Sequence, residues 1–202
     1  MTKNIIEYSD AELYNMLFED KSTSERAFKE IYARYSKNVL SYCRHFLKTD
    51  EDAEDAFQEA FMKLYSAKTA NKEMTNMAGY LITITRNICY NHLRDHNIVM
   101  VEYDEYLDDK SEFKIDNLDI SLDNQTIGQY IDSAINELSD HLREVFILRE
   151  YEGFSYNDIV EITNETLDVV KVRLHRAKKQ VREFLEVKLR ELVPEKAQKV
   201  KW

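Results

Sequence analysis

The chain has 202 residues, of which 33% are charged and 44% hydrophobic, and its formal net charge is −10. This composition is ordinary for a globular protein of one or two domains, and the negative net charge argues against a protein that coats nucleic acid uniformly. Three glycines and one proline are too few for the turns of a strand-rich fold. The sequence therefore predicts an all-α fold.

Two cysteines, Cys43 and Cys89, are too few for a disulfide framework, and we expect both to be buried free thiols. The first residues lack the basic start and apolar core of a signal peptide. No apolar run approaches the ~20 residues of a membrane span. We therefore expect a cytoplasmic protein that does not insert into a membrane.

Apolar residues at spacings of three and four predict four helices in the N-terminal half. Ser9 opens an S-x-x-E capping box at the start of the first helix, and Ser24 is expected to cap a longer second helix. Residues 49–52 open the third helix with an acidic first turn that suits the helix dipole. The fourth helix is expected from about residue 78 to residue 96. Together these helices form the first predicted domain, residues 1–98.

Residues 99–127 carry nine acidic and two basic residues among isolated apolar ones. Such a segment buries too little surface to offset the entropy of ordering it, so we interpret it as an acidic linker. A second helical domain is predicted over residues 128–192, followed by a lysine-rich tail at residues 193–202. The predicted architecture is thus two helical domains joined by an acidic linker.

The second domain has the pattern of a helix-turn-helix. Gly153 is expected to end one helix, and Ser155 to cap the next. Asn164 stands where the motif needs a tight turn, because Asn tolerates positive φ better than most residues. Thr166 is a natural N-cap for the last helix.

The last helix concentrates positive charge, with eight basic and two acidic residues in the range 171–190. Lys171, His175, Lys178 and Arg182 recur at spacings of four, three and four, which places them on one outward stripe. A charged run is usually a solvated surface, but charges of one sign at this spacing destabilise a helix. The stripe therefore favours contact with DNA, because the second helix of this motif enters the major groove.

Residues 142–185 resemble the promoter-reading C-terminal domain of the extracytoplasmic-function (ECF) sigma factors of bacterial RNA polymerase. Residues 52–61 (DAEDAFQEAF) resemble the polymerase-binding helix of that family, and residues 77–95 (MAGYLITITRNICYNHLRD) resemble its signature for reading the minus-ten element. The C-terminal residues that match the family pattern in register are Arg143, Val145, Phe146, Leu148, Arg149, Glu152, Gly153, Ser155, Tyr156, Ile159, Val170, Lys171, Arg173, Leu174, Arg176 and Ala177.

The resemblance implies a sigma factor that binds core RNA polymerase, directs it to promoters and helps to open the minus-ten region, with no enzymatic chemistry of its own. It implies that Asp55, Gln58 and Glu59 contact the clamp helices of the polymerase β′ subunit. Asp55 and Glu59 lie four residues apart on one helical face with Gln58 beside them, and an acidic face suits an Arg-rich partner helix. The apolar stripe of the same helix is expected to face the core; it consists of Phe57, Phe61, Leu64 and Tyr65.

For the minus-ten element, the resemblance implies a melted strand with one base flipped into a pocket beside the preceding loop. Asn87 and Asn91, four residues apart, could offer amide donors and acceptors to base edges. The residues that the resemblance assigns to this element are Thr75, Asn76, Met77, Arg86, Asn87 and Asn91.

For the minus-thirty-five element, the resemblance places Lys171, His175 and Arg176 in the major groove, with Arg149 and Arg173 near backbone phosphates. Val172, which could touch a thymine methyl, belongs to the same surface. Asp168, Val169 and Val172 depart from the residues common in the family. The base preference is therefore expected to differ from that of other members.

The partners implied are the β and β′ subunits of core RNA polymerase, promoter DNA and an anti-sigma factor, and a monomer is expected when the protein is free. No cofactor is expected. The alternative is a helix-turn-helix regulator that reads an operator without polymerase, with the N-terminal half as a dimerisation or sensor domain. A substitution in the segment 52–65 discriminates between these functions, because only the sigma factor needs that segment for polymerase binding.

A metal site is a weaker alternative. Cys89, His92 and His96 have spacings compatible with metal ligands on a helix. However, no fourth ligand is evident, and no Glu stands in an H-E-x-x-H arrangement. We therefore expect no metal.

Overall fold

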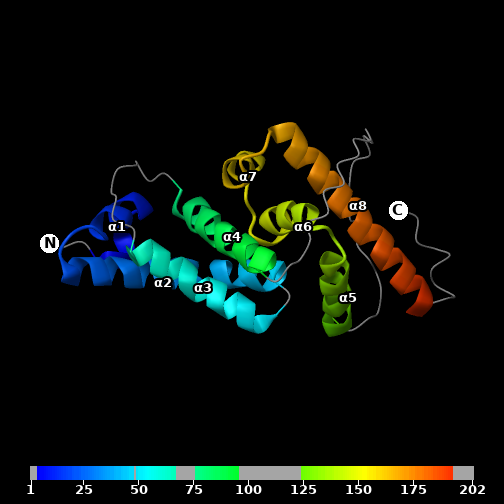
Figure 1. Ribbon diagram of the computed structural model, residues 1–202, viewed down its shortest axis with the longest axis horizontal. Coiled ribbons are helices and arrows are strands. Elements are labelled where there is room, and N and C mark those ends of the chain that lie inside the picture. The colour runs from blue at the N-terminus through cyan, green and yellow to red at the C-terminus, as the bar shows by residue number, and fades with distance from the viewer. Residues whose placement is uncertain (1–3, 48, 67–75, 96–123, 193–202) are drawn as a thin grey trace. The chain divides into compact units, whose positions relative to one another are not determined.

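The computed structural model describes residues 4–47, 49–66, 76–95 and 124–192. Every regular element in these residues is helical, which confirms the predicted all-α fold. The helices divide into two compact units (Figure 1). The first contains the 3-10 turn η1 (Ile5–Glu7) and the helices α1 (Asp10–Met16), α2 (Lys21–Phe46), α3 (Asp50–Ser66), α4 (Met77–Asp95) and, apart from its first residue, α7 (Tyr156–Thr163). The second contains α5 (Asn124–Asn136), α6 (Asp140–Phe146), the π-helical turn η2 (Ile147–Tyr151) and α8 (Leu167–Leu192).

The domain boundaries expected from the sequence, 1–98 and 128–192, remain predictions. Most of the expected acidic linker, residues 99–123, lies outside the described residues, and so does the expected tail at 193–202.

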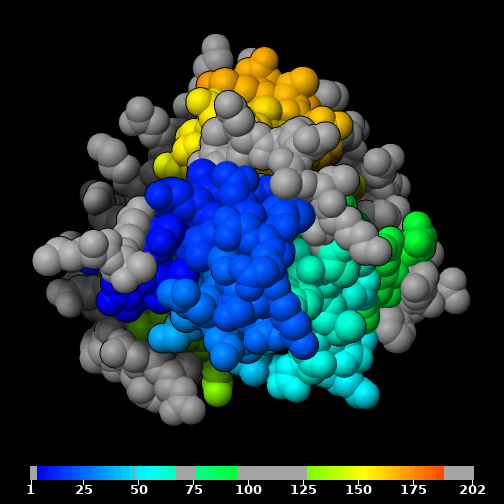
Figure 2. All heavy atoms as spheres, turned by 90° about the vertical axis from the view of Figure 1, so that its left-hand side faces the viewer, coloured from blue at the N-terminus to red at the C-terminus, as the bar shows by residue number. Residues whose placement is uncertain are grey.

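In the first unit α3 packs against both α2 and α4. On the face drawn in Figure 2, α2 (blue) and α3 (cyan) lie side by side. The buried residues of α3 are Ala53, Ala56, Ala60, Phe61 and Leu64. Small side chains at a contact allow two helices to approach closely, so the three alanines set the spacing of this packing.

The apolar stripe expected on this helix is only partly correct. Phe61 and Leu64 are buried, but Phe57 is half-buried and Tyr65 is 47% exposed. All three aromatic rings of this stripe meet rings of α2. The ring centroids of Phe57 and Phe61 lie 5.9 and 4.8 Å from that of Tyr32, and the centroid of Tyr65 lies 5.1 Å from that of Phe28. The core face thus consists of the three alanines with Phe61 and Leu64, and Phe57 and Tyr65 lie at its edge.

The helix starts confirm one expected cap and correct another. Ser9 caps α1 as expected, because its Oγ accepts from the Glu12 N–H at 3.3 Å while a Glu12 carboxylate oxygen accepts from the Ser9 N–H at 2.6 Å. Ser24 does not cap α2, which begins three residues earlier at Lys21. Asp20 is the cap, with Oδ1 accepting from the Ser22 and Thr23 N–H groups at 2.9 and 3.2 Å. The Ser24 hydroxyl lies inside the helix and donates to the Leu17 carbonyl at 2.9 Å.

Arg34 of α2 fixes the N-terminal segment to the first unit. Its guanidinium donates to Asp10 Oδ1 at 3.0 Å, to Glu30 Oε1 at 2.8 Å and to the Ile6 carbonyl at 2.9 Å. The hydroxyl of Tyr35 also donates to Asp10, and burial raises the pKa of Tyr35. These bonds join η1 and α1 to α2.

The core of the first unit includes both cysteines. Cys43 and Cys89 are fully buried free thiols, as expected. Tyr42 and Phe46 of α2 are also fully buried, with their rings stacked at a centroid distance of 5.5 Å and an interplanar angle of 11°.

In the second unit, the buried Arg143 of α6 closes the end of α5. Its guanidinium donates to the carbonyls of Ile135 (3.1 Å), Asn136 (2.9 Å) and Leu138 (2.9 Å). The last carbonyls of a helix have no partner within the helix, so a buried cation at this point satisfies them. Arg143 therefore holds the α5–α6 turn.

The helix-turn-helix connectivity is as expected. Gly153 follows η2 with φ of 72°, and α7 begins three residues later. Asn164 has φ of 58°, the only positive value among non-glycine residues in the described ranges, and it stands in the turn between α7 and α8. Thr166 Oγ1 accepts from the Val169 N–H at 3.4 Å and its carbonyl accepts from the Val170 N–H at 3.0 Å, which places Thr166 at the start of α8.

Candidate polymerase and nucleic-acid interfaces

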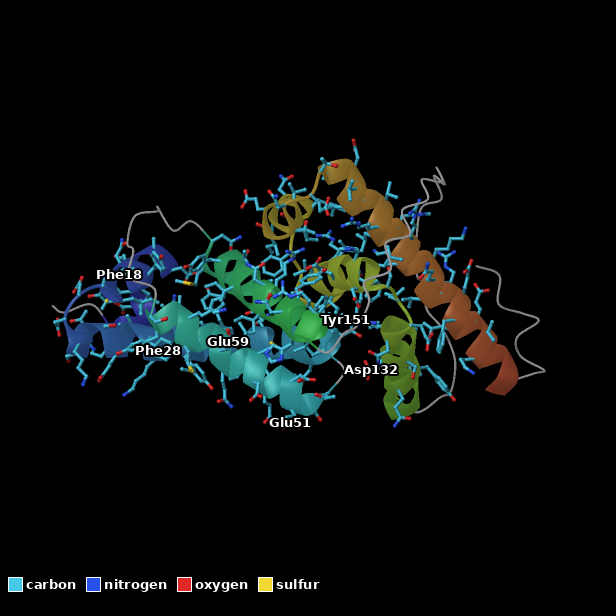
Figure 3. All side chains as sticks on the ribbon, in the orientation of Figure 1. Phe18, Phe28, Glu51, Glu59, Asp132 and Tyr151 are labelled. Atoms are coloured by element: carbon cyan, nitrogen blue, oxygen red, sulfur yellow. The ribbon has the colours of Figure 1, made fainter. Side chains whose placement is uncertain are left out.

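The acidic surface of α3 consists of Asp55, Gln58 and Glu59. Asp55 and Gln58 are exposed, and the Glu59 side chain is 46% exposed. Because the alanines occupy the opposite face of the helix, all three polar side chains can reach a partner. Figure 3 shows Glu59 in the middle part of α3, with Glu51 nearer its start.

Glu59 lies close to basic side chains on two helices. The Nζ atom of Lys63, one turn along α3, lies 2.8 Å from Glu59 Oε1. The His92 ring on α4 approaches two carboxylates of α3, with Nδ1 3.7 Å from Asp52 Oδ1 and Nε2 4.0 Å from Glu59 Oε2. The sequence did not indicate the His92 contacts, because they join helices that are distant in the chain.

The residues expected to read the minus-ten element lie on α4. Asn87 and Asn91 are exposed along one line of the helix, as their four-residue spacing requires. Arg94, one turn further on, donates from Nη2 to Asn91 Oδ1 at 3.2 Å. The opposite face of α4 is buried through Leu81, Ile82, Ile88 and Leu93. The helix therefore presents amide groups to solvent and apolar groups to the core.

The three residues expected around a flipped base have different environments. Asn76 precedes α4, where its Oδ1 accepts from the Gly79 N–H at 2.9 Å and so satisfies one unpaired donor of the first turn. Met77 is fully buried in the core of the first unit. Thr75 lies outside the described residues.

Arg86 packs on an aromatic ring that the sequence did not indicate. Its guanidinium carbon Cζ lies 4.7 Å from the ring centroid of Tyr90, one turn further along α4. The Tyr90 ring in turn lies 5.1 Å from the buried ring of Phe46 on α2. An Arg and a Tyr four residues apart on a helix could have been noticed in the sequence, whereas the contact with Phe46 could not.

The residues expected to read the minus-thirty-five element lie mostly on α8, with different degrees of exposure. Lys171 is exposed, and Val172, His175 and Arg176 are half-buried. Arg173 is 8% exposed, and its Nη1 atom donates to Glu165 Oε1 at 3.0 Å. The assignments to DNA remain predictions, and the ion pair with Glu165 competes with a phosphate for the Arg173 guanidinium.

The basic stripe expected on α8 is not wholly outward. The Lys178 side chain is 20% exposed, and its Nζ atom lies 2.8 Å from Glu150 Oε1 on η2. His175 and Arg182 are half-buried, whereas Lys171 is exposed. The spacing correctly placed these residues along one line, but the packing of α8 in the second unit covers part of it.

Arg149, expected near a phosphate, is held within the second unit. Its Nη1 atom donates to the Phe154 carbonyl at 2.8 Å, and its Cζ lies 5.0 Å from the ring centroid of Tyr156. The π-helical turn η2 supplies both Arg149 and the Glu150 that pairs with α8. Arg149 is therefore preorganised, with one side of its guanidinium engaged by the fold.

Two further expectations concern metals and membranes. Within residues 4–47, 49–66, 76–95 and 124–192, no group of three His, Cys, Asp or Glu side chains is arranged to hold a metal ion. Of the metal alternative, His96 lies outside these ranges. Among the described helices, none is both long enough and apolar enough to cross a membrane.

Comparison with known families decides the identity of this fold. The model of sigma-70 region 2 matches residues 31–98, which include α3 and α4, and the model of sigma-70 region 4 matches residues 128–181. The chain belongs to the sigma-70 family. Both candidate surfaces on α3 and α4 lie within the region 2 match, and the basic residues of α8 up to Lys179 lie within the region 4 match.

Individual sigma factors are similar over most of their length. The RNA polymerase sigma-H factor of Pseudomonas aeruginosa is 26% identical over 174 residues, which cover 83% of this chain and 90% of that protein. The ECF sigma-E factor of Escherichia coli K12 is 25% identical over 164 residues, which cover 78% of this chain and 85% of that protein. The sigma factor RpoE of Bartonella quintana, solved with its anti-sigma factor NepR, has a TM-score of 0.60 at 26% identity and covers 79% of this chain and 97% of that one. The chain is therefore an ECF sigma factor, a promoter-specific initiation factor of RNA polymerase.

Proposed function

We propose that this sigma factor binds core RNA polymerase through the acidic surface of α3 and reads promoter DNA with α4 and α8. The observation that carries the proposal is that α3 and α4 of the first unit each have one buried apolar face and one solvent-facing polar face. On α3 Asp55 and Gln58 are exposed and Glu59 is half-exposed, while the alanines are buried. On α4 the two asparagines are exposed while the apolar side chains are buried. Each helix thus keeps one polar face for a partner.

The acidic surface of α3 suits a partner helix rich in arginine. Asp55 and Glu59 offer carboxylates one turn apart, and Gln58 between them can both donate and accept. Arginine binds carboxylates through two parallel hydrogen bonds, which fixes orientation as well as adding affinity. We infer that the clamp helices of the polymerase β′ subunit supply such arginines.

On DNA, Asn87 and Asn91 are proposed to read bases of the melted minus-ten strand through their amides. Arg86 is proposed to meet a phosphate beside them. At the minus-thirty-five element, Lys171, His175 and Arg176 are proposed to face the major groove, with Val172 near a thymine methyl and Arg149 and Arg173 near phosphates. Thr75 and Asn76 complete the proposed minus-ten set, whereas Met77, which is fully buried, can act only by holding the start of α4 in place.

An anti-sigma factor is the proposed inhibitory partner. The related RpoE of Bartonella quintana is bound by an anti-sigma factor, NepR. Release from such a factor would make the protein available to polymerase. Co-purification of a tightly bound second protein from the native cell, displaced when core polymerase is added in excess, is the outcome expected.

The proposed polymerase contact is tested by charge reversal. Asp55→Lys should lower the affinity for core polymerase by at least ~100-fold, because it replaces an attractive pair by a repulsive one at the centre of the interface. Glu54→Lys is the matched control, since this 60% exposed neighbour lies beside Arg44 of α2, with 3.8 Å between Arg44 Nη2 and Glu54 Oε1. Binding to immobilised core polymerase and run-off transcription are the two measurements.

The two functions differ in the result they predict. If Asp55→Lys and Glu54→Lys bind polymerase equally well, the proposed interface is wrong. If the wild-type protein binds a specific DNA site tightly without polymerase, the operator-binding alternative replaces the proposed function. The match of residues 31–98 to sigma-70 region 2 supports the sigma factor, because an operator-binding regulator needs no such region.

A further inference from the structure

Four side chains of the first unit form a continuous column from the core to the surface of α4 beside Asn87 and Asn91. We call it the aromatic column; it consists of Tyr42, Phe46, Tyr90 and Arg86. The Tyr42 and Phe46 rings are fully buried and stacked, with their centroids 5.5 Å apart. The ring centroid of Tyr90 lies 5.1 Å from that of Phe46, and the Arg86 Cζ atom lies 4.7 Å from the Tyr90 centroid. Only the last two members are partly exposed.

We propose that Tyr90 is a positioning residue, which holds the Arg86 guanidinium in the orientation that contacts a promoter phosphate. The proposal rests on the proposed function, in which α4 meets the minus-ten strand. Arg86 lies one residue before Asn87, and Tyr90 lies one residue before Asn91. The ring and the cation are therefore on the flank of the amide line that reads the bases.

The physical reason concerns the flexibility of arginine. An arginine side chain has many rotamers, and a phosphate contact must offset the entropy lost when one of them is selected. When a guanidinium stacks on a ring, its N–H groups point outward in the guanidinium's own plane. They can therefore still donate to phosphate oxygens. Stacking therefore orders Arg86 before DNA arrives without consuming all of its donors.

The ring must itself be fixed for this to work. Tyr90 packs on Phe46, which is fully buried and stacked on Tyr42. The closely packed core restricts the rotamers of these two rings, so the Tyr90 ring rests on a rigid support. The aromatic column thus restricts the conformations of the Arg86 side chain on α4, because each ring is held by the one beneath it.

The test compares variants of Tyr90 in holoenzyme assembled with core polymerase. The probe is a promoter fragment selected with wild-type holoenzyme from sheared genomic DNA. Tyr90→Leu should weaken binding about three- to five-fold, the range expected for a partly exposed cation–π contact. Tyr90→Phe and Tyr90→Trp keep an aromatic face and should restore wild-type affinity.

Two further measurements separate positioning from a purely structural role. Arg86→Ala should reduce the slope of log K against log salt concentration by about 0.7 to 0.9, as loss of one phosphate contact does. Combining Arg86→Ala with Tyr90→Leu should add nothing to the loss in affinity, because Tyr90 acts only through Arg86. Tyr32→Leu, which removes an α2 tyrosine that packs on Phe57 and Phe61, is the control and should leave DNA affinity unchanged.

The outcomes distinguish this inference from the proposed function. If wild-type holoenzyme shows no promoter-specific binding, the proposed function fails and the inference falls with it. If wild type binds but Tyr90→Leu binds equally well, or Tyr90→Phe is as weak as Tyr90→Leu, the positioning role is wrong and the sigma-factor function stands. Additive losses in the double variant would also overturn it.

Discussion

Arg143 provides the most direct test of the forces that hold the second unit together. Arg143→Met keeps most of the aliphatic volume but removes three hydrogen bonds from a guanidinium to the carbonyls of Ile135, Asn136 and Leu138, and a weaker pairing with Asp140 at 3.4 Å. Hydrogen bonds from a charged donor contribute about 1.5–3 kcal/mol each, and their effects do not add fully. Because the carbonyls would lose their partner in a buried place, the expected destabilisation is about 3–5 kcal/mol.

Native-state hydrogen exchange can assign this loss to one unit, whereas a single unfolding curve of a protein with two units cannot. Peptides from α5, α6 and α8 should lose protection in Arg143→Met, and peptides from α2 to α4 should not. Arg149→Met is the matched control, because Arg149 donates to one carbonyl, that of Phe154, and its loss should cost about 1.5–2 kcal/mol, well below the loss expected for Arg143→Met. Equal effects of the two substitutions, or a loss below ~1 kcal/mol for Arg143→Met, would refute the reasoning.

Three further predictions concern a glycine pair, a helix cap and an ion pair. Gly153→Ala should destabilise the protein by about 1–2 kcal/mol, because φ is 72° there. Gly128→Ala within α5 should instead stabilise it by about 0.5–1 kcal/mol. Neither added Cβ meets an atom within 4 Å, so the stability change measured by hydrogen exchange would report backbone conformation alone. A hydrogen bond from the Thr23 hydroxyl lowers the pKa of Asp20. The cap therefore stabilises the fold fully above the pKa of the unfolded state, about 3.9, and less as pH falls through the lower pKa of the folded state. In urea unfolding, the stability advantage of wild type over Asp20→Asn should disappear below about pH 4, and a difference that is constant with pH would contradict this. Glu165→Gln removes the 3.0 Å ion pair of Arg173. The slope of log K against log salt concentration for holoenzyme binding to promoter DNA should then become steeper by about 0.9. An unchanged slope would remove Arg173 from the set of phosphate contacts.

Local signals in the sequence predicted the local features well. The capping box at Ser9 and the positive φ at Asn164 each depend on residues within one turn, so the sequence contains the whole interaction. The start of α2 shows the limit of this approach. Asp20, Ser22, Thr23 and Ser24 all offer capping oxygens, and the sequence does not show which of them caps the helix. In the structure Asp20 accepts from the Ser22 and Thr23 N–H groups, while the Ser24 hydroxyl donates to the Leu17 carbonyl.

Features that depend on packing between helices were not accessible from the sequence. Aromatic side chains are more hydrophobic than alanine, so the sequence predicted that Phe57 and Tyr65 face the core; close approach of α3 to its neighbours selects alanines instead. The ion pair of Arg173 joins it to Glu165, eight residues earlier and outside the spacings at which helical residues meet. The contacts of His92 and Tyr90 likewise join separate helices.

The ion pairs within the second unit bear on how the sigma factor should use its basic helix. Lys178 pairs with Glu150 and Arg173 with Glu165, so part of the positive charge of α8 is already neutralised within the protein. Under the proposed function, the remaining charge attracts DNA against a formal net charge of −10. Affinity of the separate protein for duplex DNA should therefore be low, and attachment to polymerase would supply it by raising the effective concentration of α8 at the promoter. Under the proposed function, a basic helix that binds DNA weakly alone would keep the unbound factor from occupying promoters in the absence of polymerase.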